Sequence, residues 1–120
     1  MKHFALLLCL LSIALPAAAA SSADMGMEEV RVLGRLNGQA LACSHAVAVA
    51  RIKAQMIKLA PKTRRYGEAF ETATNDGYLA QVKKDKSTCP AMPALLEQVE
   101  DTAKRLQAAL AVSTIEVTTP

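Results

Sequence analysis

The sequence predicts an all-α fold: a small bundle of three to four helices closed by one disulfide bond between Cys43 and Cys89. Aromatic residues make up only 3% of the 120 residues, while alanine and leucine, which favour helices, are frequent. Apolar residues recur every three or four positions, which is the period of a helix with one buried face. No long stretch alternates apolar and polar residues as a half-buried strand would.

The chain begins with a segment typical of a secretory signal peptide. Lys2 and His3 precede an apolar run that ends near Leu15, and alanines follow as far as Ala20. A membrane-spanning helix needs roughly 18 to 20 apolar residues, and this run is shorter. We therefore interpret 1–20 as a cleaved leader and expect a periplasmic or secreted protein. In the remainder we expect an N-terminal segment at 21–28, a helical domain at 29–112 and a flexible tail at 113–120.

Two cysteines remain after cleavage, because Cys9 belongs to the apolar part of the leader. An even number of cysteines in an oxidising compartment predicts a disulfide bond, here between Cys43 and Cys89. The chain-entropy model gives a stabilisation of about 4 kcal/mol for a closed loop of this length. A domain this small gains much from such a bond, because its hydrophobic core is small.

The first helical region starts at Met27. A single helix from there to Leu59 would span about 50 Å, which is long for a compact domain of this size. We therefore expect a break near Cys43 and Ser44, with Ser44 as the N-cap of a second helix. The predicted buried stripe continues across the break, with Leu33, Leu36, Ala40, Cys43, Val47, Ala50, Ala54 and Ile57.

A third helix is expected to start at Arg64, because Pro61 ends the preceding region and Thr63 can act as its cap. Tyr66 and Phe70 should then lie on one face of that helix. The tripeptide Asn75-Asp76-Gly77 is a turn signal, which predicts that the third helix stops or kinks there.

The last helix is expected between Pro93 and Ala111, after a polar loop at 83–88 and an extended Cys89-Pro90 segment. Ion pairs at four-residue spacing are expected on its exposed face, from Glu97 and Asp101 to Arg105 and from Glu100 to Lys104. Its predicted buried stripe is Leu96, Val99, Ala103, Leu106 and Leu110.

Small residues repeat every fourth position through the first two helical segments, beginning with Gly34, Gly38 and Ala42 and continuing to Ala54. Such a ridge lets another helix approach closely. Two interpretations stay open from the sequence. The ridge packs inside the domain, or it forms a surface for a partner helix or a homodimer.

A block between Val30 and Gly67 contains eight basic residues and no acidic residue. Acidic residues dominate the rest of the domain, so one interpretation is that the two sets of charges complement each other across packed helices. The other is a patch for a negatively charged partner or an anionic membrane surface. No nucleic acid is expected, since no aromatic residues are interleaved with these bases. The candidate interaction surface combines the ridge and the block: Gly34, Gly38, Ala42, Arg51, Lys58, Lys62, Arg64 and Arg65.

The sequence contains no recognisable catalytic constellation, so we expect a protein that is not an enzyme and has no cofactor. His45 is the only histidine after the leader, and a residue two positions away on a helix, such as Cys43, points in a different direction. The one metal hypothesis is a soft Cu(I) site, for which thioether and imidazole are suitable ligands. Its ligands would come from Met25, Met27, His45, Met56 and Met92.

The layout of a leader, a short helical domain and two cysteines, the second just before the last helix, resembles that of small acid-stress chaperones of the bacterial periplasm. The resemblance implies a protein that opens at low pH and binds unfolded clients. It covers architecture alone, and Ala42-Cys43-Ser44-His45 lacks the aromatic residues that the family has around its first cysteine. Our leading hypothesis is a non-enzymatic helical interaction protein of the bacterial envelope or periplasm, with a protein partner or a homodimer. A chaperone and a copper-binding protein are the alternatives.

Overall fold

The computed structural model describes residues 24–117, with side chains as far as Val112, and this part of the chain folds into four α-helices and no strand. The helices are α1 (Met27–Ala42), α2 (Ala46–Leu59), α3 (Arg64–Val82) and α4 (Met92–Val117). A short 3-10 helix, η2 (Lys86–Thr88), lies between α3 and α4. The predicted all-α class and the predicted disulfide bond are confirmed. The predicted signal peptide, 1–20, lies outside the described residues.

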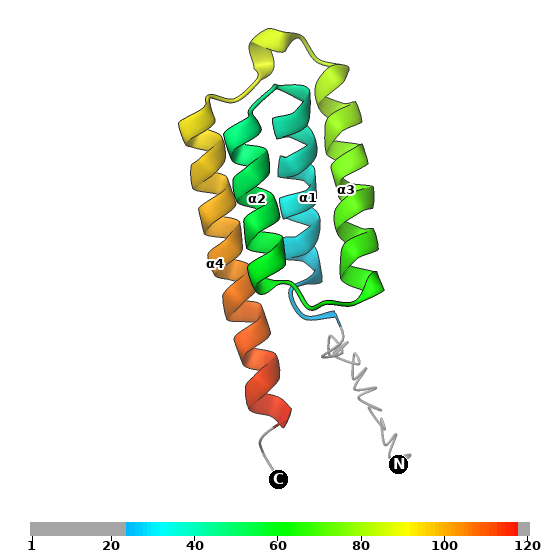
Figure 1. The fold of residues 1–120 in the computed structure, drawn as a ribbon, viewed down its shortest axis with the longest axis vertical. Coiled ribbons are helices and arrows are strands. Elements are labelled where there is room, and N and C mark those ends of the chain that lie inside the picture. The colour runs from blue at the N-terminus through cyan, green and yellow to red at the C-terminus, as the bar shows by residue number, and fades with distance from the viewer. Residues whose placement is uncertain (1–23, 118–120) are drawn as a thin grey trace, which may run out of the picture.

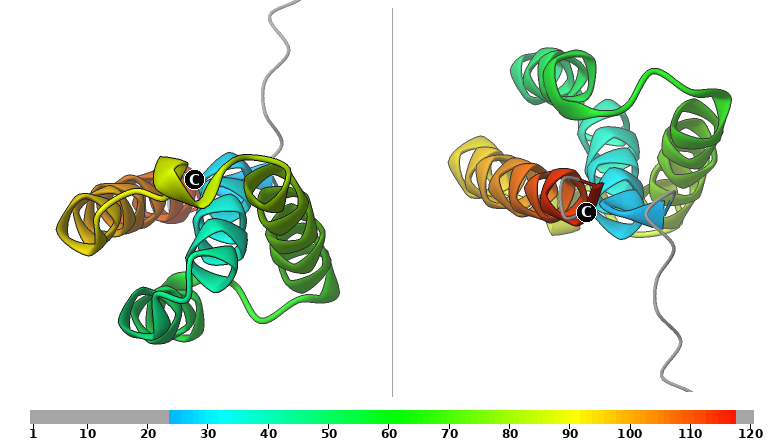
Figure 2. Two further views of the ribbon diagram at one scale, coloured as in Figure 1. Left: turned by 90° about the horizontal axis from the view of Figure 1, so that it is seen from above. Right: turned by 90° about the horizontal axis from the view of Figure 1, so that it is seen from below.

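Helix α1 occupies the centre of the bundle, and the other three helices surround it (Figures 1 and 2). It packs most extensively against α3 and less extensively against α2 and α4, while α2 also packs against α4. Helices α2 and α3 follow each other in the chain but hardly touch each other. One side of α2 and one side of α3 are therefore left without a helix beside them.

The core is aliphatic and is formed mainly by α1 and α4. A fully buried side chain of the size of leucine or valine contributes about 1.5 to 3 kcal/mol relative to an exposed one. The predicted α4 stripe is confirmed at Val99, Ala103 and Leu106, although Leu95 rather than Leu96 is its first fully buried residue. The large apolar side chains that are completely buried are Val30, Leu33, Ile52, Leu95, Val99 and Leu106.

Glycines bring α1 and α3 into contact at the level of the backbone. A Cβ atom added to Gly38 would lie 2.0 Å from the carbonyl oxygen of Thr74, and one added to Gly34 would lie 2.6 Å from that of Phe70. The interpretation that the ridge packs inside the domain is confirmed for these two glycines. Their assignment to a surface for a partner is wrong, because α3 covers them.

The predicted stop of the third helix at 75–77 is also wrong, because α3 continues to Val82. A Cβ atom on Gly77 would lie 2.3 Å from the carbonyl oxygen of Arg35. Gly77 is therefore needed for the close approach of α1 and not for a turn.

The predicted break between the first two helices is confirmed, and the structure shows how it forms. The N–H of His45 donates to the carbonyl oxygen of Ala40 at 2.8 Å, and the N–H of Ser44 donates to that of Leu41 at 3.2 Å. This pair of bonds is the Schellman motif that ends many helices, and Ser44 takes the left-handed conformation (φ 58°) in which glycine is usual. The prediction that Ser44 caps α2 is wrong, because the N-cap is His45.

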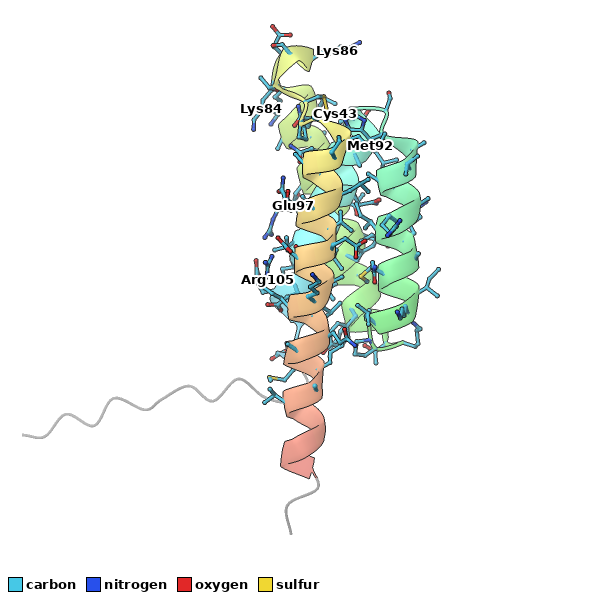
Figure 3. The ribbon with its side chains drawn as sticks, turned by 90° about the vertical axis from the view of Figure 1, so that its left-hand side faces the viewer. Cys43, Lys84, Lys86, Met92, Glu97 and Arg105 are labelled. Carbon is cyan, nitrogen blue, oxygen red and sulfur yellow. A yellow bond between two sulfur atoms is a disulfide. The ribbon has the colours of Figure 1, made fainter. Side chains whose placement is uncertain are left out.

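The disulfide bond between Cys43 and Cys89 holds this α1–α2 joint against the segment that precedes α4. The two Cα atoms are 5.8 Å apart, and the bond closes a loop between residues separated by 46 positions. Figure 3 shows Cys43 close to Met92, where α4 begins. A hydrogen bond of 2.9 Å between His45 Nε2 and the carbonyl oxygen of Pro90 joins the same two segments.

The predicted buried stripe is confirmed in α1, at Leu33, Leu36 and Ala40, but it is wrong in α2. There the buried residues are Ala48 and Ile52, whereas Val47 and Ile57 are 58% and 72% exposed. The left-handed conformation of Ser44 at the joint changes the rotation of α2 about its own axis. A period counted through α1 therefore does not continue into α2.

The last helix is longer than predicted. It begins at Met92 and continues to Val117 instead of ending at Ala111, so 113–117 are helical and do not form a tail. Neither glycine nor proline interrupts the sequence before Pro120, and Leu110 still packs against the core. The last turns of α4 extend past the ends of the other helices (Figure 1).

Candidate functional site

The α2 face, as we name it, is the exposed side of α2 that points away from α1. It combines four apolar residues with three basic ones, and α2 contains no acidic residue at all. An ordinary surface helix exposes polar residues, so a face of this composition is unusual for a helix exposed to water. The α2 face consists of Val47, Ala50, Ala54 and Ile57 with Arg51, Lys53 and Lys58.

Three bases of the predicted interaction surface are engaged within the chain. Arg51 Nη1 donates to Glu100 Oε1 at 2.8 Å and joins α2 to α4. Arg65 pairs with Asp24, and Lys62 Nζ donates to the carbonyl oxygens of Met56 and Ala60 at 3.3 and 3.1 Å, at the end of α2. For Arg51 and Arg65, charge complementarity inside the chain accounts for the basic block, whereas Lys62 binds the carbonyl groups at the end of α2.

The other bases of the block near α2 are less constrained. Arg64 lies 3.8 Å from Glu68, but the two side chains are 88% and 66% exposed, so this pair contributes little to stability. Lys53 and Lys58 form no ion pair within residues 24–112. Ala42, the last member of the predicted surface, is half-buried at the end of α1.

Two hollows adjoin α2, one at each end. A hollow of about 480 Å³ lies at the joint, where Leu41 and Ala40 of α1 meet Val49 and Lys53 of α2. A second hollow of about 240 Å³, which we name the loop hollow, lies where α2 turns into α3. Mostly apolar residues line the loop hollow, among them Met56, Ile57, Ala60, Tyr66 and Gly67.

A third hollow, of about 400 Å³, lies between α1 and α3 and is lined largely by charged side chains. Its arginines are balanced by nearby carboxylates. Arg35 Nη2 donates to Glu28 Oε1 at 2.8 Å, and Arg31 lies 3.7 Å from the same carboxylate. The hydrogen bond from Arg35 lowers the pKa of Glu28, which keeps this carboxylate ionised. The arrangement stabilises the start of α1 and leaves little positive charge for an anionic ligand.

The predicted ion pairs within α4 do not form. Glu100 pairs with Arg51 of α2, and Arg105 Nη2 donates to Thr102 Oγ1 at 3.0 Å. Glu97 and Arg105 both lie on the outer side of α4, well separated along the helix (Figure 3).

Of the soft ligands proposed for copper, His45 and Met92 are not brought together with Met25 and Met27. His45 and Met92 lie at the disulfide end of the bundle, while Met25 and Met27 lie at the opposite end of α1, which is about 24 Å long. Within the described part of the chain, no group of three or more histidine, cysteine, aspartate or glutamate residues is arranged to hold a metal ion.

Sequence reasoning missed three residues of this region, namely Lys53, Ile57 as an exposed residue, and Gly67. One signal was present in the sequence. Helix α2 contains more apolar residues than a single buried stripe can hold, so a second apolar face was to be expected.

Between residues 24 and 117, none of the helices is long and apolar enough to cross a bilayer. Comparisons with protein-family models, with curated proteins and with solved structures find no match for this chain. The functional argument therefore rests on the geometry of the α2 face itself.

Proposed function

We propose that this chain is an exported, non-enzymatic helical docking protein of the bacterial envelope or periplasm, and that it binds another polypeptide through the α2 face. The observation that carries the proposal is the exposure of Val47 and Ile57, 58% and 72%, on a helix with basic and no acidic residues. Exposed apolar side chains ringed by charge are typical of surfaces that bind other proteins.

The structure supports a rigid presentation of this face. The disulfide bond and the His45–Pro90 hydrogen bond hold the start of α2, and Lys62 binds the carbonyl groups at its end. A surface that is already ordered loses less conformational entropy when it binds. The leader-like segment and the disulfide bond favour export into an oxidising compartment.

Capture from envelope extract tests the proposal. The full chain, expressed with its own leader and a C-terminal tag, is used as bait, and bound proteins are identified by mass spectrometry. We expect a defined bound polypeptide, with recovery reduced at least about tenfold when Val47→Ser and Ile57→Ser are combined, which is about 1.4 kcal/mol of binding free energy. Val112→Ser, which removes an exposed apolar residue from α4, serves as the matched control. Equal recovery with both variants would contradict the proposal.

A client-binding chaperone that opens at low pH is the second candidate. The observation that favours it is that Glu28 pairs with Arg35, which lowers the pKa of Glu28, so that protonation of this carboxylate in acid removes an ion pair at the start of α1. A chaperone of this kind loses its tertiary structure near pH 3 and then suppresses the aggregation of a denatured client. A docking protein keeps one partner at neutral pH and shows no such activity.

A further inference from the structure

We infer that the polypeptide bound on the α2 face is a second copy of this chain, in a symmetric homodimer in which α2 of each copy lies against α3 of the other. The inference rests on the proposed function, because it names the partner of the same surface. In a two-fold symmetric dimer every contact occurs twice, so a modest set of complementary groups suffices.

Gly67 is the first observation. Residues 24–117 contain four glycines inside helices, and at three of them an added Cβ atom would collide with the facing helix. At Gly67 nothing lies within 4 Å of such an atom. A glycine inside an exposed helix destabilises that helix relative to alanine, and nothing within the described chain offsets this loss at Gly67. By analogy with Gly34, Gly38 and Gly77, it marks a place where another helix comes close.

Ile57 is the second observation. It is 72% exposed, more than any other large apolar residue with a described side chain, and it lines the loop hollow together with Gly67. When α2 of one copy lies on α3 of the other at the same level, Ile57 meets the space above Gly67 of the second copy. The most exposed side chain then fills the place where a side chain is missing.

Charge decides which helices pair. Three bases and no acid lie on α2, so α2 against α2 of a second copy would bring like charges together. Exposed acidic residues instead lie on α3, among them Glu68 and Glu71. Charge therefore favours the pairing of α2 with α3 of the second copy.

Lys53 and Glu71 give this pairing a specific charged contact. Helices α2 and α3 run in opposite directions (Figure 1), and Ile57 and Gly67 line the same hollow. Lys53, one turn before Ile57, and Glu71, one turn after Gly67, therefore lie at one level. Both side chains are exposed and form no ion pair within residues 24–112. In the dimer, Lys53 of each copy faces Glu71 of the other.

The ends of α2 and α3 that lie farthest from the loop hollow both expose apolar side chains. At the disulfide end, Val47 near the start of α2 is exposed, and so are Leu79 and Val82 near the end of α3, at 53% and 48%. The α2 face and the outer side of α3 therefore both expose apolar side chains at the disulfide end, and they carry opposite charges at Lys53 and Glu71.

Charge exchange tests the inference. The oxidised full chain, expressed with its own leader, is analysed by sedimentation equilibrium over a wide range of concentrations, and we expect a monomer–dimer equilibrium. Lys53→Glu and Glu71→Lys should each weaken dimerisation at least about tenfold, and the two together should restore it, because the pair is then reversed. Glu97→Lys, on the outer side of α4 (Figure 3), is the control and should leave dimerisation unchanged.

Gly67→Ala separates binding from stability. An alanine there should raise the thermal midpoint of unfolding and at the same time weaken dimerisation, whereas a purely structural role would move both in the same direction. In an equimolar mixture, the single variants Ile57→Cys and Gly67→Cys should form a disulfide bond between copies, since Cys43 and Cys89 are already paired.

A monomer at all concentrations, or a dimer insensitive to the charge exchange, would overturn the inference. If the protein is monomeric while Val47→Ser with Ile57→Ser still abolishes capture of an envelope protein, the homodimer fails and the proposed function stands. If the protein is a monomer that binds phosphatidylglycerol vesicles through Lys53 and Lys58, the inference fails, and the partner of the α2 face is an anionic membrane. Absence of both dimerisation and surface-dependent capture contradicts the inference and the proposed function together.

Discussion

The contact between α1 and α3 and the exposed side of α2 differ in the residues that form them. Small residues form the first, and apolar and basic residues form the second. Helix α3 has few apolar residues, yet it approaches α1 so closely that Gly34, Gly38 and Gly77 leave no room for a side chain. Helix α2 is the more apolar of the two, yet only Ala48 and Ile52 are buried. The number of apolar residues in a helix therefore does not measure how firmly it is held. Small residues mark where backbones meet, and the surplus apolar residues of α2 lie on its exposed side.

Removal of the disulfide bond should give the largest difference in stability between α2 and the α1–α3 pair. The variant Cys43→Ser with Cys89→Ser should lose about 4 kcal/mol in the free energy of unfolding, as measured by urea denaturation. Hydrogen exchange should accelerate more in α2 than in α1 or α3, because the bond fastens the start of α2 and not the α1–α3 contact. A uniform acceleration over the three helices would contradict the comparison.

Two isoleucines, Ile52 and Ile57, allow the buried and the exposed side of α2 to be compared within one helix. Ile52→Ala should cost about 3 kcal/mol, because Ile52 is completely buried and its removal leaves a cavity. Ile57→Ala should change the free energy of unfolding of the monomer by no more than about 0.5 kcal/mol, because this side chain is 72% exposed. Urea denaturation at low protein concentration measures both values. Similar costs at the two positions would show that the faces of α2 are wrongly assigned.

The α1–α3 contact is broken most directly at Gly38. Gly38→Ala should destabilise the protein by about 2 kcal/mol, because the new Cβ atom would lie 2.0 Å from a backbone oxygen of α3 and the helices must separate. Thermal unfolding followed by circular dichroism measures the change. A stabilised Gly38→Ala protein would mean that the two helices are not in backbone contact.

A smaller loss of stability than at Gly38 is expected at Tyr66, which joins α3 to the segment before α1. Its hydroxyl group donates to the carbonyl oxygen of Met25 at 2.8 Å, so Tyr66→Phe should cost about 1 kcal/mol near neutral pH. Burial, and then the charge of Asp24, raise the pKa of Tyr66 above its usual value of 10.

This shift of the Tyr66 pKa fixes the sign of the pH dependence. The unfolded chain ionises at lower pH than the folded one, so the stabilisation is complete below pH 10 and is lost as the pH rises beyond it. Urea denaturation of both proteins at neutral pH and above pH 10 should show the difference shrinking. A difference that stays constant would contradict the shifted pKa.

Local patterns in the sequence were sufficient for much of the fold. The even number of cysteines predicted the bond between Cys43 and Cys89, and helical length predicted the break at the joint. The stripes of α1 and α4 were predictable because each helix keeps one rotation along its whole length. The Gly34–Gly38 spacing predicted a close helix contact, although it did not say which helix would make it.

Features that depend on distant partners were not predictable. The sequence at Asn75 is typical of a turn. Gly77 is instead needed for its contact with Arg35, and that contact joins residues far apart in the sequence. The stripe of α2 was wrong because the left-handed conformation of Ser44 sets the rotation of the next helix. Arg51 was expected in a surface patch, but Glu100 of α4 lies within reach of it.

The joint at Cys43–His45 has a consequence for how this protein tolerates change. Since α2 is apolar around most of its circumference, its own composition accepts more than one orientation on α1, and the backbone of three residues selects the orientation that occurs. One residue inserted there would turn every side chain of α2 by about 100° and present a different set of residues to solvent. The length of this joint, more than the composition of α2, therefore decides which residues of α2 are exposed.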